Sequence, residues 1–206
     1  MSLKGKTKQD VVAEFRNAEI LEAARKVFAA NGFAGTSVEA IAQEAGIAKG
    51  TLYLYYDSKS EIYQEALRNG LVELCSLLKA QVERAGTIGE KIRVFIATKL
   101  SFFEENRDFF KIYYAEFGNA IAHPAETHRT IRELYVEQVS VLKSALTEAV
   151  RRKKVRSVKP LSVAFAINDL TRGLITQRLL GQTETEISED IEFLYEFIWR
   201  GITCQS

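Results

Sequence analysis

The chain has 206 residues and a formal net charge of +1 at pH 7, with 47% hydrophobic and 27% charged residues. This composition is typical of a globular protein, and the small net charge excludes an argument for nucleic-acid binding from bulk electrostatics. Two cysteines, Cys75 and Cys204, are too few for a disulfide framework, so we expect free thiols in a reducing compartment. No apolar run approaches the roughly 20 residues of a membrane span and no signal peptide precedes the first helix, which predicts a cytoplasmic protein.

Three helices and the start of a fourth are expected within the first 65 residues, where apolar residues recur at three- and four-residue spacing. The first runs from about residue 17 to 31 and ends at Gly32. A capping box predicts the second, with Thr36 as N-cap and Glu39 reaching back, and this helix ends at Gly46. The third covers about residues 48–56, and a second capping box, Ser58–Glu61, opens a long helix to about residue 85.

Five further helices complete the chain, and no segment reads convincingly as a strand. A capping box at Thr87–Glu90 opens the first of them, Asn106 caps the next, and Gly118 breaks it. Pro124 and Pro160 sit where two later helices can begin. The expected ranges are about 87–105, 106–117, 124–150, 160–181 and 187–202. The sequence therefore predicts an all-α fold of nine helices.

The segment from Thr36 to Tyr56 has the form of a helix-turn-helix, because two short helices are joined by a tight turn that contains glycine. On a helical wheel its second helix turns Leu52 and Tyr56 inward and Gly50 and Leu54 outward, with Thr51 and Tyr53 on the flanks. Such a face suits a duplex, since glycine permits close approach, hydroxyls donate to phosphate and leucine can touch a thymine methyl. The alternative interpretation is an ordinary solvent-exposed surface.

The runs Phe28–Ala42 (FAANGFAGTSVEAIA) and Ala45–Tyr56 (AGIAKGTLYLYY), followed by Ser58 and Lys59, closely resemble the DNA-binding domain of the TetR/AcrR family. The resemblance is free of gaps over roughly 45 positions. It implies a two-domain fold, with a DNA-binding domain over residues 1–58 and an effector-binding and dimerisation domain over residues 59–206.

The resemblance also assigns DNA contacts to individual residues. The implied set is Thr36 and Ser37 at the start of the second helix, Lys49, Gly50, Thr51, Tyr53, Leu54 and Tyr55 along the groove, and Lys59 on a phosphate. The chain departs from the family pattern at Ala48, where serine is common, at Tyr55, where histidine is common, and at Tyr56, usually phenylalanine. The tail residues Lys4, Lys6 and Lys8 form either a basic arm that follows phosphates or a solvated, disordered tail.

The last two helices carry more apolar surface than one core-facing stripe requires. In the last helix the stripe is Ile187, Ile191, Leu194, Ile198 and Ile202, and Phe193, Phe197 and Gly201 widen it. In the helix after Pro160 the stripe is Val163, Ala166, Ile167, Leu170 and Leu174, widened by Phe165, Leu179 and Leu180. We expect a homodimer that pairs these helices in a four-helix interface, as the resemblance also implies, with an ordinary core as the alternative.

Seven aromatic residues lie between Phe102 and Phe117, and they indicate either dense core packing or a pocket for an apolar ligand. The resemblance implies an effector cavity in this region. The candidate ligand-binding residues are Phe103, Phe110, Tyr113, Tyr114 and Phe117, with Asn168 and Arg172 as polar groups that could fix a ligand, and Asn119 and His123 nearby. Each polar residue could instead lie at the surface or in an interface.

Catalysis, cofactors and metals are not indicated, because the sequence has no phosphate-binding glycine loop, no nucleophile with a base and no paired carboxylates. His123 and His128 lie five residues apart without a suitably spaced carboxylate, which argues against a metal site. The leading hypothesis is a ligand-responsive repressor that binds a double-stranded DNA operator as a homodimer and releases it on binding a small effector. The alternatives are a helical protein-interaction module and an apolar-ligand carrier without affinity for DNA.

Overall fold

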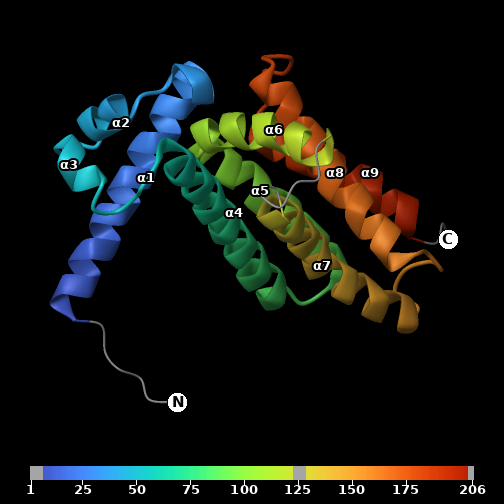
Figure 1. Ribbon diagram of the computed structural model, residues 1–206. Coiled ribbons are helices and arrows are strands. Elements are labelled where there is room, and N and C mark those ends of the chain that lie inside the picture. The colour runs from blue at the N-terminus through green and yellow to red at the C-terminus, as the bar shows by residue number, and fades with distance from the viewer. Residues whose placement is uncertain (1–6, 123–128, 204–206) are drawn as a thin grey trace. The chain divides into compact units, whose positions relative to one another are not determined.

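The computed structural model in Figure 1 describes residues 7–122 and 129–203. All regular structure within these ranges is helical, so the prediction of an all-α fold is confirmed. The described helices are α1 (Lys8–Gly35), α2 (Val38–Glu44), α3 (Lys49–Leu52), α4 (Lys59–Arg84), α5 (Ile88–Glu105), α6 (Arg107–Ala122), α7 (Arg129–Arg151), α8 (Pro160–Leu179) and α9 (Ile187–Ile202).

Local signals account for several helix ends. Thr87 and Glu90 form the predicted capping box at the start of α5, where the Thr87 amide donates to the Glu90 carboxylate over 2.8 Å. Pro160 occupies the first turn of α8, where its missing N–H is not needed. Gly32 and Gly46 take the left-handed conformation, with φ of +68° and +64°, and each breaks a helical run as expected.

Two helices extend beyond their predicted ends. The structure begins α1 at Lys8, about nine residues earlier than expected, because Thr7 and Asp10 form a capping box that the sequence analysis missed. Gly118 does not break α6, which continues to Ala122, since one glycine costs a helix only about 1 kcal/mol relative to alanine. The predicted helix start at Pro124 and the tail residues Lys4 and Lys6 lie outside the described residues.

The chain packs as two compact units, each with its own core. The first unit contains the described residues up to Gly70 together with Asp108–Gly118 of α6, and the second contains Leu71–Arg107 and the described residues beyond Gly118. This division by packing cuts through α4 and α6, whereas the functional division at residue 58 stays a prediction.

The core of the first unit joins α1, α2, α3 and parts of α4 and α6. Its fully buried side chains include Ile20, Leu21, Phe28, Ile41, Leu52, Ile62, Phe109 and Phe110. Gly70 on α4 lies directly against the Phe109 ring, since a Cβ at this glycine would come within 2.5 Å of two ring carbons. Burying such aliphatic and aromatic side chains stabilises the unit by about 1.5–3 kcal/mol each.

In the second unit α5 contacts α7, α8 and α9, and α8 in turn contacts α7 and α9 (Figure 1). The predicted α9 stripe is largely confirmed, because Leu194, Ile198 and Ile202 are buried. The predicted α8 stripe is wrong at Ala166 and Leu170, which are exposed. The buried face of α8 instead carries Ala164, Ile167, Asn168, Thr171, Leu174 and Ile175. Polar Asn168 and Thr171 take core positions because each has a hydrogen-bond partner there.

None of the helices in the described ranges is both long and apolar enough to cross a lipid bilayer.

Candidate DNA-binding and effector sites

The helix-turn-helix consists of α2, a turn through Gly46, and α3. Ser37 caps α2 by accepting a hydrogen bond from the Ala40 amide over 3.1 Å. The prediction that Thr36 would be this N-cap is wrong, because its hydroxyl donates instead to the Gly32 carbonyl at 2.8 Å. Thr36 is only 4% exposed and serves the end of α1 rather than the start of α2. Ser37 remains exposed at the helix start.

The predicted third helix is shorter than expected, since regular α-helix ends at Leu52 rather than near Tyr56. The chain continues through tighter turns, in which the Leu54 amide donates to the Thr51 carbonyl and the Tyr55 amide to the Leu52 carbonyl. These i to i+3 bonds keep the chain wound through Tyr55, so the side chains retain a roughly helical arrangement.

The orientation of this segment is as the helical wheel predicts. Leu52 and Tyr56 are buried, at 0% and 5% exposure, whereas Tyr53 is 44% and Leu54 83% exposed. The predicted groove residues Lys49 and Gly50 are exposed, while Thr51 and Tyr55 are half-buried. Leu54 and Tyr53 thus place two large apolar side chains next to each other on the exposed side of this segment.

Lys49 stands at the edge of this face and forms an ion pair with Glu39 of α2. The hydrogen bond from Lys49 lowers the pKa of the Glu39 carboxyl, and the same bond raises the pKa of the lysine. The Lys49 ammonium also lies 5.7 Å from the centroid of the Tyr53 ring. Because the pair is fully exposed it stabilises the fold little, and a phosphate can compete with Glu39 for the lysine.

Lys59 occupies a different environment from the phosphate contact that the resemblance implies. Its ammonium donates to the carbonyls of Phe33 and Thr36, both at 2.8 Å, and lies 4.6 Å from the Phe33 ring centroid. Two of its three N–H groups are therefore engaged with the segment that leads into α2. One N–H remains for a ligand, so this lysine positions the helix-turn-helix whatever else it does.

The predicted aromatic residues fall into both units. Phe110, Tyr113 and Phe117 are buried and Tyr114 half-buried on α6 in the first unit, whereas Phe103 is fully buried on α5 in the second. The α6 rings pack on one another, with centroid distances of 5.5 Å from Tyr113 to Tyr114 and 5.6 Å from Tyr113 to Phe117. Such contacts are typical of core packing. A role of these residues in ligand binding stays a prediction.

The two predicted polar residues of α8 lie at a buried cluster in the second unit. Asn168 is fully buried and accepts a hydrogen bond from Lys99 of α5 over 2.6 Å. Arg172 is half-buried and pairs with Asp169 at 3.2 Å, and Asp169 also accepts a hydrogen bond from the Tyr135 hydroxyl at 2.6 Å. Burial lowers the pKa of Lys99 to about 7, because the charged form is poorly solvated there.

Sequence reasoning missed Lys99 and Gln138, which are 4% and 1% exposed. A signal was available, because each occupies a core position of a helical stripe. Lys99 lies one turn from Phe95 and Phe103 on α5, and Gln138 lies one turn from Leu134 and Leu142 on α7. Because both side chains are polar, each residue interrupts the apolar periodicity of its helix, and so it was not recognised as part of the buried stripe.

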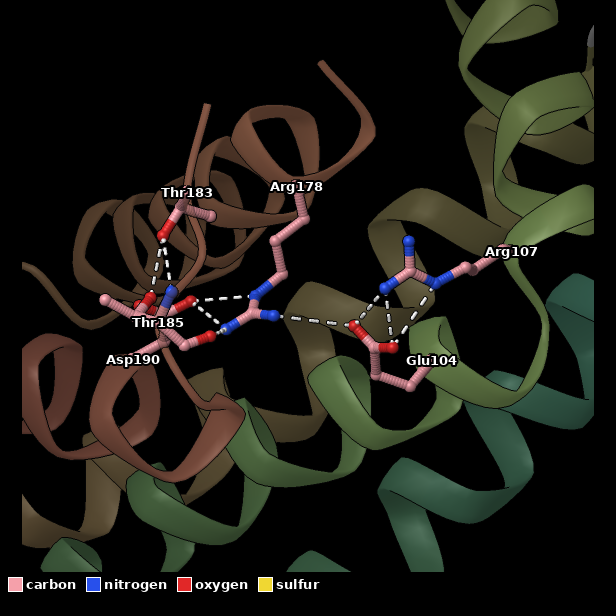
Figure 2. A network of polar contacts seen from close by, with 6 residues as sticks. All are labelled: Glu104, Arg107, Arg178, Thr183, Thr185 and Asp190. Carbon is pink, nitrogen blue, oxygen red and sulfur yellow. Dashed lines mark hydrogen bonds and ion pairs between the residues drawn. The ribbon is translucent and has the colours of Figure 1, made fainter. Parts of the chain in front are cut away.

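A second polar cluster joins the ends of α5, α8 and α9 (Figure 2). The Arg178 guanidinium donates to the Asp190 carboxylate at 2.8 Å and to the Thr185 carbonyl at 2.7 Å, and it lies 3.5 Å from Glu104. Glu104 is also held by Arg107, and the Thr185 hydroxyl donates to the other Asp190 oxygen at 2.8 Å. Every charged group in this cluster has an opposite charge beside it, which is how buried ions are tolerated.

Apolar side chains remain exposed on the last two helices. On α9, Phe193 and Phe197 are 64% and 61% exposed and stack with ring centroids 6.4 Å apart. They line a groove of about 470 Å³ together with Gly201 and the flanking Glu196 and Arg200. The predicted widening of the α9 stripe is therefore confirmed as exposed apolar surface.

A larger cavity, about 700 Å³ in volume, lies between the start of α5, the end of α7 and the C-terminal half of α9. Its wall includes the stacked rings of Tyr195 and Trp199, with the Arg93 guanidinium 4.1 Å from the Tyr195 centroid. Arg93 is already paired with Glu192, and Arg152 on the opposite wall is paired with Glu148. Two of its cationic groups are thus paired with carboxylates of the chain, and a third, Lys91, donates to the Val82 carbonyl.

Metal-binding geometry does not occur within the described ranges, where no three histidine, cysteine or acidic side chains gather. His123 and His128, which the sequence analysis does not expect to bind a metal, lie outside the described residues, as does Cys204. Cys75 is buried, its thiol lies 3.5 Å from the Leu134 carbonyl, and burial raises its pKa to about 12.

The family of the chain follows from its first unit. A family model described as "Bacterial regulatory proteins, tetR family" matches residues 20–66, a range that contains the whole helix-turn-helix and the start of α4. Residues 20–66 therefore form a DNA-binding domain of the TetR type. The members of this family that it matches are transcriptional regulators.

Relatives of this chain match well beyond the DNA-binding segment. The fatty acid metabolism regulator protein of Bacillus subtilis is 24% identical over 138 residues, which cover 67% of this chain and 70% of that protein. The repressor KstR2 of Rhodococcus jostii is 27% identical over 150 residues, which cover 73% and 72% of the two chains.

Solved structures of TetR-family regulators share the fold. A putative fatty acid metabolism regulator of Clostridium perfringens superposes with a TM-score of 0.75 at 26% identity, covering 91% of this chain and all of that one. FadR of B. subtilis, solved in complex with stearoyl-CoA, gives a TM-score of 0.75 at 19% identity and covers 88% and 96% of the two chains. The two-domain TetR fold predicted from the sequence is therefore confirmed.

Proposed function

We propose that this TetR-family regulator is a repressor that binds a palindromic operator as a homodimer through α8 and α9 and is released by an acyl-chain effector. No catalytic residue is assigned. The observation that carries the DNA-binding part is the exposure of Leu54 and Tyr53 beside the fully buried Leu52.

The DNA contacts follow from this face. Leu54 is placed to contact a thymine methyl, and Tyr53 and Thr51 are placed to donate to phosphates or base edges. Gly50 lets the backbone approach the groove. The space outside Gly50 is open in the free protein, because a Cβ there would meet nothing within 4 Å. Lys49 supplies a cation, and Ser37 and Tyr55 flank the contact. We assign Thr36 and Lys59 to the same interface as residues that hold the helix-turn-helix in position.

The homodimer is supported by exposed apolar surface on both helices. Phe193 and Phe197 on α9, and Leu161 and Leu170 on α8, are all more than one third exposed. Large aromatic side chains at this exposure mark an interaction surface in a soluble protein. A two-fold dimer would present two identical heads to a palindrome, with half-sites about one DNA turn (~34–36 Å) or a multiple apart.

The effector class is proposed from the relatives. Two of them are named as regulators of fatty acid metabolism, and one was solved with stearoyl-CoA bound. A long acyl chain also suits the second unit, whose interior is formed mainly by apolar side chains. A ligand that binds better to one arrangement of the heads shifts the population and so releases DNA.

The test begins with selection of genomic fragments by the purified protein at low ionic strength, followed by titration of the best fragment. We expect steep salt dependence, and about 10- to 100-fold weaker binding by Leu54→Ala and Tyr53→Ala, equivalent to about 1–3 kcal/mol per contact. Val136→Ala, an equally apolar exposed position on α7 (48% exposed), is the matched control and should bind as the wild type does.

Two results would contradict the proposal. Retention of no duplex at low salt would favour a protein-interaction module or a ligand carrier, especially if stearoyl-CoA still bound. Light scattering that finds the free protein monomeric at micromolar concentration would remove the dimer. Stearoyl-CoA is expected to dissociate the wild-type complex, and a complex that ignores it would overturn the effector class alone.

A further inference from the structure

Three buried donors lie in the interior of the second unit, and we call Lys99, Gln138 and Asn168 the donor cluster. Lys99 donates to the Asn168 side-chain oxygen Oδ1 over 2.6 Å. With the lysine as donor and Oδ1 as acceptor, the Asn168 nitrogen Nδ2 points away from the lysine. Gln138 Nε2 has no hydrogen-bond partner among the described residues. Asn168 Nδ2 makes no hydrogen bond of standard geometry there, although the Asn168 amide is close enough to the Tyr135 hydroxyl to oppose the rise in the pKa of that phenol.

The nearby acceptors are already occupied. Asp169 receives the Tyr135 hydroxyl at 2.6 Å and the Arg172 guanidinium at 3.2 Å. The Leu134 carbonyl, one turn before Gln138, has the Cys75 thiol at 3.5 Å in addition to its helical hydrogen bond. Gln138 lies one turn beyond Tyr135 on α7, and therefore on the same face of that helix. The Asp169 carboxylate and the Leu134 carbonyl are thus already engaged by other donors.

A buried donor without an acceptor is unfavourable in the free protein, because it has lost its hydrogen bonds to water and gained none in return. A ligand that supplies oxygen acceptors recovers this free energy, whereas a purely apolar ligand does not. The side chains around the cluster are apolar. The centroid of the Phe95 ring lies 5.6 Å from the Lys99 side-chain nitrogen, and Leu142 on α7 and Ile167 and Leu174 on α8 are buried. An oxygen head on a hydrocarbon chain fits these surroundings.

We propose that the donor cluster is the polar anchor of the effector site and binds the carbonyl-type oxygen of an acyl chain, either a fatty-acid carboxylate or an acyl thioester. The assignment rests on the proposed function, because it takes the effector to be an acyl compound. Asn168 was a sequence candidate for fixing the ligand, whereas Lys99 and Gln138 are new.

The position of the anchor also explains how such a ligand could act. The cluster lies inside the unit, between α5, α7 and α8, so an acyl head reaches it only when these helices part. A ligand of this kind binds the parted conformation more tightly than the closed one, and differential affinity of this sort is required of an effector.

Three probes test the anchor: stearoyl-CoA, stearate, and S-octadecyl-CoA, a thioether that keeps the chain and the CoA but lacks the carbonyl oxygen. Binding is measured by calorimetry and by release of the protein from DNA. If the wild-type protein donates a hydrogen bond to the thioester oxygen, stearoyl-CoA binds about 10- to 100-fold more tightly than the thioether, as expected for one hydrogen bond from a buried donor. If the anchor instead binds a carboxylate, stearate is the one probe of the three that binds tightly.

Gln138→Met removes the unpartnered donor and nearly keeps its volume. We expect its melting temperature to equal or exceed that of the wild type, while its preference for the oxygen-bearing probe falls at least tenfold. Thr171→Val is the matched control, because Thr171 is also fully buried but its hydroxyl already donates to the Ile167 carbonyl at 2.8 Å. This variant should lose stability and keep the ligand preference.

The two proposals fail in different ways. If no probe releases the wild-type protein from DNA, the acyl effector is wrong and the anchor falls with it. If the wild type responds but does not distinguish thioester from thioether, and stearate binds no better, the anchor alone is wrong. The same holds if Gln138→Met is destabilised yet keeps the wild-type ligand preference.

Discussion

Two polar clusters in the second unit differ in how many of their hydrogen-bond donors have an acceptor. The paired cluster in Figure 2, centred on Arg178 and Asp190, sets each donor against an acceptor: a guanidinium faces two carboxylates and a carbonyl, and a hydroxyl fills the remaining carboxylate oxygen. The donor cluster of Lys99, Gln138 and Asn168 holds one hydrogen bond, and two of its amide nitrogens make no hydrogen bond of standard geometry among the described residues.

The difference between the two clusters indicates that they have different roles. A fully matched buried network orients the elements it joins, and it leaves nothing for a ligand to supply. A buried set with unpartnered donors reduces the stability of the free protein, and in our proposal the effector supplies the acceptors that complete it. We therefore expect substitutions in the paired cluster to change stability, and substitutions in the donor cluster to change ligand binding.

The largest effect is expected for Arg178→Met. The Arg178 side chain is 9% and the Asp190 side chain 11% exposed, so the substitution leaves a nearly buried carboxylate without its main partner. Removing one member of a buried ion pair costs about 3–5 kcal/mol. Chemical denaturation monitored by circular dichroism should detect this loss in the free energy of unfolding.

Arg200→Met is the control for this prediction. Arg200 pairs with Glu196 in the same way, but its side chain is 81% exposed, and an exposed pair contributes about 0–1 kcal/mol. Equal stabilities of the two variants would mean that burial does not set the strength of the Arg178 contacts, and the contrast between the two clusters would lose its basis.

The pH dependence of stability tests the donor cluster. Burial lowers the pKa of Lys99 to about 7 from 10.5, with Asp169 and Cys75 opposing the shift and Arg172 adding to it. Between these values the unfolded chain binds a proton that the folded chain does not, so stability rises with pH. The slope is at most about 1.4 kcal/mol per pH unit for one proton. Lys99→Met should abolish this rise.

The comparison is best made between pH 7 and 9, because the Cys75 thiol, whose pKa burial raises from 9.0 to about 12, contributes the opposite slope above that range. In this window the wild type should gain stability relative to Lys99→Met as the pH rises, and the difference should be flat below pH 7. Gln138→Met, which changes no titrating group, should show a constant difference from the wild type. A constant difference for Lys99→Met as well would mean that the lysine is charged in the folded protein.

The sequence predicted those features of the fold that depend on a few neighbouring residues. The capping box at Thr87, the proline at the start of α8 and the glycine breaks at Gly32 and Gly46 each act within one or two turns, and all were placed correctly. The orientation of residues 49–56 followed from helical periodicity alone, because Leu52 and Leu54 lie nearly on opposite sides of a helix.

Two of the errors arose where a side chain bonds outside the helix to which its sequence pattern assigns it. Thr36 was expected to cap α2, yet its hydroxyl bonds to Gly32, because the turn between the helices brings the end of α1 closer. Asn168 and Lys99 are 69 residues apart in sequence, and their hydrogen bond, which allows both to be buried, cannot be derived from either helix alone.

The smallest effect is expected in the first unit, where Lys59 and Lys49 repeat the contrast between a matched and an available donor. Lys59 is held by two carbonyls, so Lys59→Met should lower the free energy of unfolding by about 1 kcal/mol, a value reduced from that of a buried charged hydrogen bond because the site is partly exposed. Lys49→Met should leave stability nearly unchanged, because its pair with Glu39 is exposed, and should instead weaken operator binding and reduce its salt slope by about one. Thermal melts and DNA titrations on both variants separate these effects. If Lys59→Met weakened DNA binding with no loss of stability, the ammonium would act mainly on phosphate, and the two carbonyl contacts would not be what holds the entry to α2.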